Sequence, residues 1–188
     1  NRRLDERVKK GEASYRMAYA AVSDLMHDSL MVYASASGEP ADWEKMLDQI
    51  VAEVSRAREH GFSTREFELA CKEITSSAER AVETESTRNA RRIVAEFNSA
   101  VNNKEPVLSA QEELDLVQEL LPTIKLPEVE HTFAENFAPG NFAYVLEMPQ
   151  KDDVKLPDTD SVLAAARAAE TRKTEARADD DEETPLLA

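Results

Sequence analysis

The sequence contains very little cysteine, a single residue among 188. One thiol excludes an internal disulfide. Cys71 lies on the apolar side of a predicted helix, which favours a small core residue over a reactive thiol. Long apolar runs are also missing, because no stretch approaches the roughly 20 residues that a membrane-spanning helix needs. The residues contain no signal-peptide pattern.

Positive charge is scarce. The chain has 23 Lys and Arg against 38 Asp and Glu, a formal net charge of -15. Phosphate binding needs clustered basic side chains, so this balance argues against a nucleic-acid partner. It argues equally against binding to an anionic membrane surface. Acidity does not by itself identify a basic substrate, since its main effect is on solubility.

Local motifs for catalysis are absent. None of the histidines His27, His60 and His131 has another within one helical turn, so neither H-E-x-x-H nor H-x-x-E-H is present. With only four glycines, the chain has no Walker-type loop and no G-x-S-x-G. The pattern around His131 favours a surface helix position, and His60 a helix end. The sequence therefore predicts no catalytic residue and no metal ligand.

The clearest pattern lies in residues 43–103, which predict two or three consecutive helices. Over residues 43–57, apolar side chains recur every three or four positions, which places them on one helical face. Charged residues, Glu53 among them, are predicted on the opposite face. Asp42 is the predicted N-cap, and Gly61 follows the predicted C-terminal end.

A capping box of Ser63 and Glu66 predicts the start of the next helix. The run without glycine or proline that follows is long enough for two helices, which should meet near residues 83–87. Ser86 or Thr87 is the predicted cap of the second one. That second helix has an apolar face formed by Ile93, Val94, Phe97 and Val101.

Alternation of period two, with aromatic residues, predicts strands over residues 13–22 and 30–36. A turn at His27 and Asp28 would join them as an antiparallel hairpin, and residues 142–148 are a predicted third strand. Further helices are predicted over residues 1–10, 109–121, 127–137 and 160–172. Together these elements predict an α+β fold: a two-layer sandwich of a small antiparallel sheet with helices packed on one face.

The composition becomes more polar after Gln150. It predicts one α/β domain over residues 1–150, followed over residues 151–188 by a linker with a short helix and an acidic tail. The acidic run at 179–183 is typical of a solvated linker rather than a cation site. A piece whose sheet lacks strands leaves a sheet edge exposed, and such an edge can pair with a second copy to form a homodimer.

A basic cluster stands out in this acidic chain, at Arg88, Arg91 and Arg92. The simpler interpretation is ion pairing with nearby carboxylates, at Glu83, Glu85 and Glu96. The alternative is a contact with another domain or with a peptide carboxylate.

The order of these motifs resembles a known family. The segment from Trp43 through Gly61-Phe62-Ser63 to Lys72 resembles the helix–Gly-Phe-Ser–helix of the insulinase/pitrilysin family of zinc metallopeptidases. Residues 84–124 and 145–149 resemble, in the same order, the long bacterial members built as two similar halves. The resemblance covers essentially the whole chain.

This resemblance implies the second, non-catalytic domain of the first half, incomplete at its N-terminus. Its partners would be the zinc-bearing domain, the second half of the same protein and a peptide substrate. Zinc is expected in the parent protein and no cofactor in this piece. The compartment stays unknown, with a periplasmic or other extracytoplasmic location among the possibilities.

The family grips substrate with an Arg and a Tyr in its C-terminal half. Arg7 or Lys9 with Tyr15 occupy roughly similar places here, although Tyr15 also fits a core or sheet-surface position. No residue is therefore assigned to substrate binding. Two other classes stay open: an inactive protease-like scaffold or subunit, and an unrelated acidic helical binding module.

Overall fold

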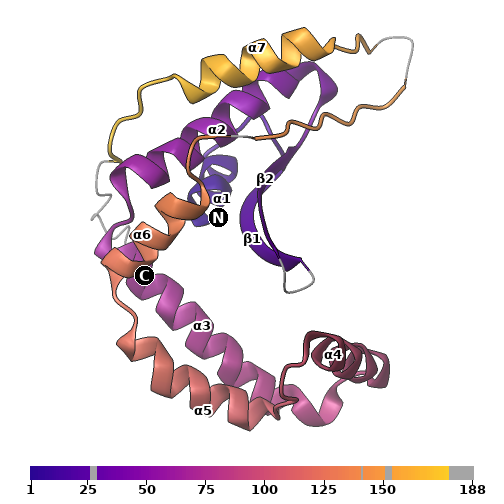
Figure 1. The fold of residues 1–188 in the computed structure, drawn as a ribbon, viewed down its shortest axis with the longest axis vertical. Helices are drawn as coiled ribbons and strands as arrows, with labels where there is room; N and C mark the ends of the chain where they lie inside the picture. The colour runs from indigo at the N-terminus through magenta and orange to yellow at the C-terminus, as the bar shows by residue number, and fades with distance from the viewer. Residues whose placement is uncertain (26–28, 141, 151–153, 178–188) are drawn as a thin grey trace, which may run out of the picture. The chain divides into compact units, whose positions relative to one another are not determined.

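The computed structural model describes residues 1–25, 29–140, 142–150 and 154–177 (Figure 1). The chain divides into two compact units, each described here by itself. Unit 1 comprises Asn1–Ser23, Leu30–Gly61 and the chain from Thr132 onward. Unit 2 comprises Asp24–Ser29 and Phe62–His131.

Unit 1 contains most of two antiparallel strands, whose ends at the turn belong to unit 2, and the helices before and after these strands. They are α1 (Arg2–Lys9), β1 (Met17–Leu25), β2 (Ser29–Ser37), the 3-10 turn η1 (Pro40–Asp42), α2 (Trp43–His60) and α7 (Thr159–Glu170). Unit 2 is helical, with α3 (Thr64–Thr84), η2 (Glu85–Thr87), α4 (Ala90–Asn103), α5 (Ala110–Leu120) and η3 (Leu121–Thr123). Helix α6 (Leu126–Asn136) has residues in both. The predicted α+β class, with helices packed on an antiparallel sheet, is confirmed.

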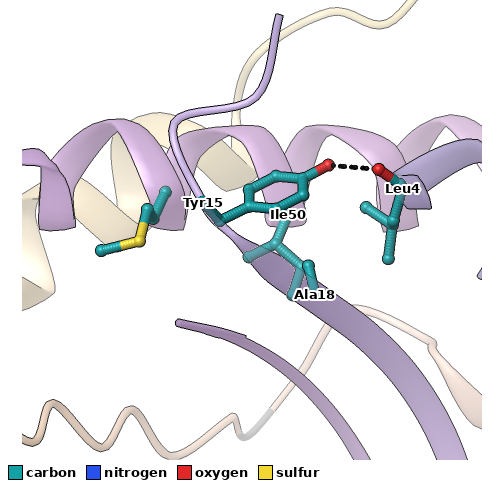
Figure 2. Close-up of a cluster of buried hydrophobic side chains, with 5 residues drawn as sticks. Leu4, Tyr15, Ala18 and Ile50 are labelled. Atoms are coloured by element: carbon teal, nitrogen blue, oxygen red, sulfur yellow. Dashed lines mark hydrogen bonds between the residues drawn. The ribbon is translucent and has the colours of Figure 1, made fainter. Parts of the chain in front are cut away.

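The core of unit 1 forms where α1, the start of β1 and α2 meet. Leu4, Tyr15, Ala18 and Ile50 are buried there together with Met46 (Figure 2). Burial of each large apolar side chain contributes about 1.5–3 kcal/mol to stability. The hairpin and the helices therefore stabilise one another, which a two-stranded sheet needs in water.

A glutamine fixes the chain before β1 to helix α2. The Gln49 side chain accepts a hydrogen bond from the Ser14 backbone N–H at 2.8 Å and donates one to the Glu12 carbonyl at 3.1 Å. These bonds satisfy two backbone groups of an irregular segment. They hold Tyr15 in the position from which its ring enters the core.

Helix α7 packs against α2, as the yellow and purple helices of Figure 1 show. Ala166 and Ala169 are each 1% exposed, because small side chains allow close contact. The chain after α7 continues along unit 1. Arg172 pairs with Asp48 at 2.7 Å, and the Thr174 hydroxyl contacts His60 at 3.0 Å.

The predicted orientation of Glu53 is wrong. Its residue is only 8% exposed, and its carboxylate lies among Arg3, Arg7 and Arg56. The periodicity of α2 predicts a single apolar face, whereas α1 and α7 both pack on this helix. Contacts with two helices leave fewer exposed positions than a one-sided amphipathic pattern implies.

In unit 2, α3 and α5 lie side by side. The capping box of Ser63 and Glu66 is confirmed, and a second one opens α5. The break after α3 occurs where it was predicted, but the cap of α4 is Asn89, whose side chain accepts a hydrogen bond from Arg91 N–H at 2.8 Å. Thr87 was the wrong choice because its hydroxyl instead donates to the Thr84 carbonyl at 2.9 Å. Ser86 lies inside η2.

Residues 142–148 do not form the predicted third strand. Strand pairing needs a neighbouring edge within hydrogen-bonding distance, and the described sheet consists of β1 and β2 alone. Alternate side chains, those of Tyr144, Leu146 and Met148, line a groove with α7, whereas Val145 is 83% exposed. The side chains of this segment thus alternate between the groove and solvent, although the segment is not a strand. The predicted turn at His27 and Asp28 lies outside the described residues.

Gly38 should resist substitution by alanine. A Cβ there would lie 2.7 Å from Met46 Sδ and 3.1 Å from the Ser14 carbonyl oxygen. The sulfur can move, but the backbone oxygen is fixed, so we expect Gly38→Ala to cost about 1–3 kcal/mol. Gly140→Ala is the matched control, since nothing lies within 4 Å of its Cβ position. Urea unfolding followed by the fluorescence of Trp43 would measure both; equal midpoints for the two variants would contradict the expectation.

Candidate interaction surfaces

Arg7 and Tyr15, the pair suggested by the family's substrate grip, have structural contacts. Tyr15 is 4% exposed, and its hydroxyl donates to the Leu4 carbonyl at 3.3 Å (Figure 2). Burial, the largest effect, raises the pKa of the Tyr15 phenol, which Arg7 partly offsets. Arg7 itself lies 3.8 Å from the Glu53 carboxylate. Lys9 is exposed near the end of α1.

Glu53 forms the most buried charged cluster of unit 1. Arg3 Nη1 lies 3.7 Å from one carboxylate oxygen, and Arg7 and Arg56 pair with the other. Arg3 also donates to the Gly61 carbonyl at 2.9 Å. The cluster therefore fastens α1 to the middle and the end of α2.

The arginines at the start of α4 are mostly engaged in ion pairs. Arg88 and Arg92 both pair with Glu96, the latter at 3.1 Å. The Glu85 carboxylate instead accepts a hydrogen bond from the Ala110 backbone N–H at 3.0 Å. This arrangement supports the ion-pair interpretation for Arg88 and Arg92. The Arg91 side chain is exposed, and it takes no part in the ion pairs with Glu96 that the described residues form.

The histidines lie at separate positions. His60 is exposed at the end of α2, where its ring contacts Thr174. The Thr174 hydroxyl also donates to Glu59 at 2.5 Å, and this bond is the main reason why the pKa of Glu59 is lowered. His131 is exposed on α6, and His27 lies outside the described residues. Among the residues that the structure describes, no three His, Cys, Asp or Glu side chains are placed to hold a metal ion.

Cys71 is half-buried rather than fully buried, in a groove of unit 2. The groove has a volume of about 470 Å³ and lies between α3 and the chain from η3 to the start of α6. Its apolar lining includes Phe67, Cys71, Leu121, Ile124 and Leu126. Lys72 and Lys125 also line it, so the groove combines apolar walls with basic groups.

Helix α4 leaves most of its predicted apolar face uncovered. Val94 is 58% exposed, Phe97 47% and Val101 72%. Val107, in the segment after α4, is 50% exposed. An aromatic and several aliphatic side chains on one side of an amphipathic helix are typical of a surface that docks against another protein surface.

A second groove, in unit 1, has a volume of about 280 Å³ and lies between residues 144–148 and the start of α7. Tyr144 lines it, and its hydroxyl donates to Glu170. Burial, followed by this hydrogen bond to a carboxylate, raises the pKa of the Tyr144 phenol. The Tyr144 hydroxyl therefore acts as a hydrogen-bond donor to Glu170.

Sequence reasoning missed the Glu53 cluster, both grooves and the contacts of Arg172 and Thr174 with α2. Each depends on pairs of residues far apart in the chain. Only the excess of Arg in residues 2–7 hinted that α1 binds a carboxylate.

None of the helices in the described residues is long and apolar enough to cross a membrane.

No protein-family profile matches this sequence, and a search of curated proteins finds no match. Solved structures do match. The first half of the periplasmic protease PqqL from Escherichia coli aligns over 95% of this chain and 38% of that chain, with TM-score 0.73 and 18% identity. The structure of PqqL aligns over 95% of this chain and 20% of that chain, with TM-score 0.75 and 18% identity.

A further match is the ferredoxin protease FusC, solved as a mutant in complex with Arabidopsis ferredoxin. It aligns over 99% of this chain and 21% of that chain, with TM-score 0.58 and 17% identity. This chain thus spans well under half the length of each protease. The resemblance to insulinase-family proteases inferred from the sequence is confirmed at the level of fold.

Proposed function

We propose that this chain is a non-catalytic domain of a longer, insulinase-like zinc metalloendopeptidase, the second domain of its first half. The supporting observation is the match to the first half of PqqL over 95% of this chain. The sequence adds that neither H-E-x-x-H nor H-x-x-E-H is present. The fold is thus that of a protease domain, without the local motif for hydrolysis.

The proposed role is to brace the zinc-bearing domain and to line part of the chamber that encloses a peptide. Its partners are that domain, the second half of the same protein and the peptide substrate. The exposed face of α4 and the groove beside Cys71 suit packing of this kind, because both present apolar side chains to their surroundings. FusC has been solved with a bound ferredoxin, which supports a polypeptide as the occupant of such a chamber.

Zinc in the parent would activate a water molecule, with a glutamate as general base. The described residues of this chain offer no set of donors that fits the ion. The role proposed for this chain is to position the zinc-bearing domain and to enclose the peptide substrate.

The first test is metal content and hydrolysis by the purified chain. After equilibration with zinc and desalting, we expect far less than one zinc per chain by mass spectrometry. We also expect no cleavage of internally quenched peptides. One tightly held zinc per chain, or cleavage inhibited by a chelator, would refute the proposal.

An inactive protease-like scaffold or subunit is the alternative, and the same test does not separate it from the first. Sequencing the encoding DNA on both sides of this chain does. An intact H-x-x-E-H in the same reading frame supports the protease. A reading frame that encodes the same fold but lacks that motif supports a scaffold that mediates protein–protein interaction.

A further inference from the structure

The chain that follows α7, residues 171–177, forms a strap on unit 1, the yellow trace beyond that helix in Figure 1. The protein as a whole has a formal net charge of -15. The strap instead has one acidic side chain against three basic ones, those of Arg172, Lys173 and Arg177. Its one apolar side chain, Ala176, is exposed. Charge and hydrogen bonds therefore hold the strap in place, rather than apolar burial.

The first part of the strap is bound by carboxylates of α2. The Arg172 guanidinium forms a bidentate pair with Asp48, with nitrogen–oxygen distances of 2.8 and 2.7 Å. The Thr174 hydroxyl donates to the Glu59 carboxylate at 2.5 Å, and the His60 ring lies 3.0 Å from the Thr174 carbonyl oxygen. An acidic helix surface thus holds a basic segment.

The second part of the strap is bound by α2 and α1. Arg56 Nε donates to the Glu175 carbonyl at 3.1 Å, while the same guanidinium pairs with Glu53. Arg177 pairs with Glu6 of α1. The strap is therefore connected to the buried Glu53 cluster through one hydrogen bond, and to α1 through an ion pair near the surface.

The strap is held much less firmly than the helix before it. Ala166 and Ala169 of α7 are each 1% exposed, whereas the paired side chains of Arg172 and Asp48 are 57% and 28% exposed. Exposed ion pairs contribute little to stability, and the cost of ordering the backbone opposes them. The docked and released states of the strap should therefore be close in free energy, with Thr171, at the end of α7, as the point of release.

We propose that the strap is an electrostatic latch, docked on α1 and α2 at low salt and released from Thr171 onward as salt rises. Screening weakens the pairs at Asp48 and Glu6, and no apolar contact replaces them. Release moves the last attachment to unit 1 from Arg177 back to Thr171, which adds roughly 20 Å of reach to the polypeptide beyond. The latch concerns unit 1 alone and does not depend on the proposed function.

Trypsin cleavage after Lys173, followed by mass spectrometry at short digestion times, tests the latch. A synthetic peptide of residues 171–177 is the reference, because its cleavage reports how salt affects trypsin itself. Between about 0.01 M and about 1 M salt the Debye length falls from about 30 Å to about 3 Å. Over this range we expect cleavage of the chain relative to the peptide to rise about fivefold, the effect of screening two exposed pairs. Asp48→Asn should raise the low-salt ratio, and Glu44→Gln, at an exposed carboxylate of the same helix, should not.

A ratio that does not change with salt would overturn the proposal, as would equal ratios for Asp48→Asn and Glu44→Gln. A nitroxide label gives a second measurement without protease. In a Cys71→Ser background, a label on Ala176→Cys should gain a mobile component as salt rises, whereas a label on Ala168→Cys, on the exposed side of α7, should not. Equal gains at both positions would mean that α7 detaches together with the strap, and full mobility at position 176 in low salt would mean that the strap does not dock. Either result contradicts the latch.

Discussion

Replacing Glu53 with alanine is expected to destabilise unit 1 by about 3 kcal/mol, the lower end of the cost of breaking a buried ion pair. The Glu53 side chain is 10% exposed and pairs with Arg3, Arg7 and Arg56, whose side chains are 11%, 27% and 24% exposed. Removing the carboxylate leaves these cations next to one another without their shared anion. Partial exposure of two of the arginines keeps the expected cost from being larger.

Urea unfolding followed by tryptophan fluorescence would measure this loss. Trp43 is the only tryptophan, and it packs against the core of unit 1, so the signal reports that unit. Glu53→Gln preserves the size of the side chain and removes its charge. It should be destabilised almost as much as Glu53→Ala. Glu44→Ala is the control, an exposed carboxylate on the same helix, expected within about 0.5 kcal/mol of the unaltered chain. If Glu53→Ala and Glu44→Ala unfold at the same midpoint, the cluster has no stabilising role.

Local signals in the sequence were sufficient for the starts of α3 and α5 and for the existence of the hairpin, although β1 begins at Met17 rather than at residue 13. The capping box at Ser63 predicts a helix start because donor and acceptor lie within four residues of each other, and the structure has the same motif at Ser109. Alternation predicts β1 and β2 because an adjacent strand supplies the hydrogen bonds. In both cases the partner group is close in the chain.

Contacts between residues far apart in the chain could not be predicted from the periodicity of single elements. Glu53 was placed on the wrong face because α1 and α7 both pack on α2, and no periodicity within α2 reveals a second partner. Residues 142–148 have the composition of a strand, but no described strand lies beside them. The same limit applies to the groove at Cys71, whose two sides come from separate segments.

The contact between α7 and α2 provides the other large effect. Ala166 is 1% exposed, so Ala166→Glu would place a carboxylate against α2. Burying an unpaired charge costs more than the packing of one short helix supplies, so we expect α7 to detach rather than accommodate it. A detached helix of 12 residues is marginal in water and should unfold. Hydrogen exchange of the α7 amides should then approach the unprotected rate.

Ala168→Glu is the matched control for this experiment, because Ala168 lies on the exposed side of the same helix. Its α7 amides should keep the protection of the unaltered chain. The pair of variants also tests the domain boundary predicted after Gln150. If α7 were only part of a linker, Ala166→Glu and Ala168→Glu would have the same small effect on the Trp43 signal. A selective loss for Ala166→Glu means that α7 belongs to the folded core of unit 1, since detaching the helix then also weakens α2.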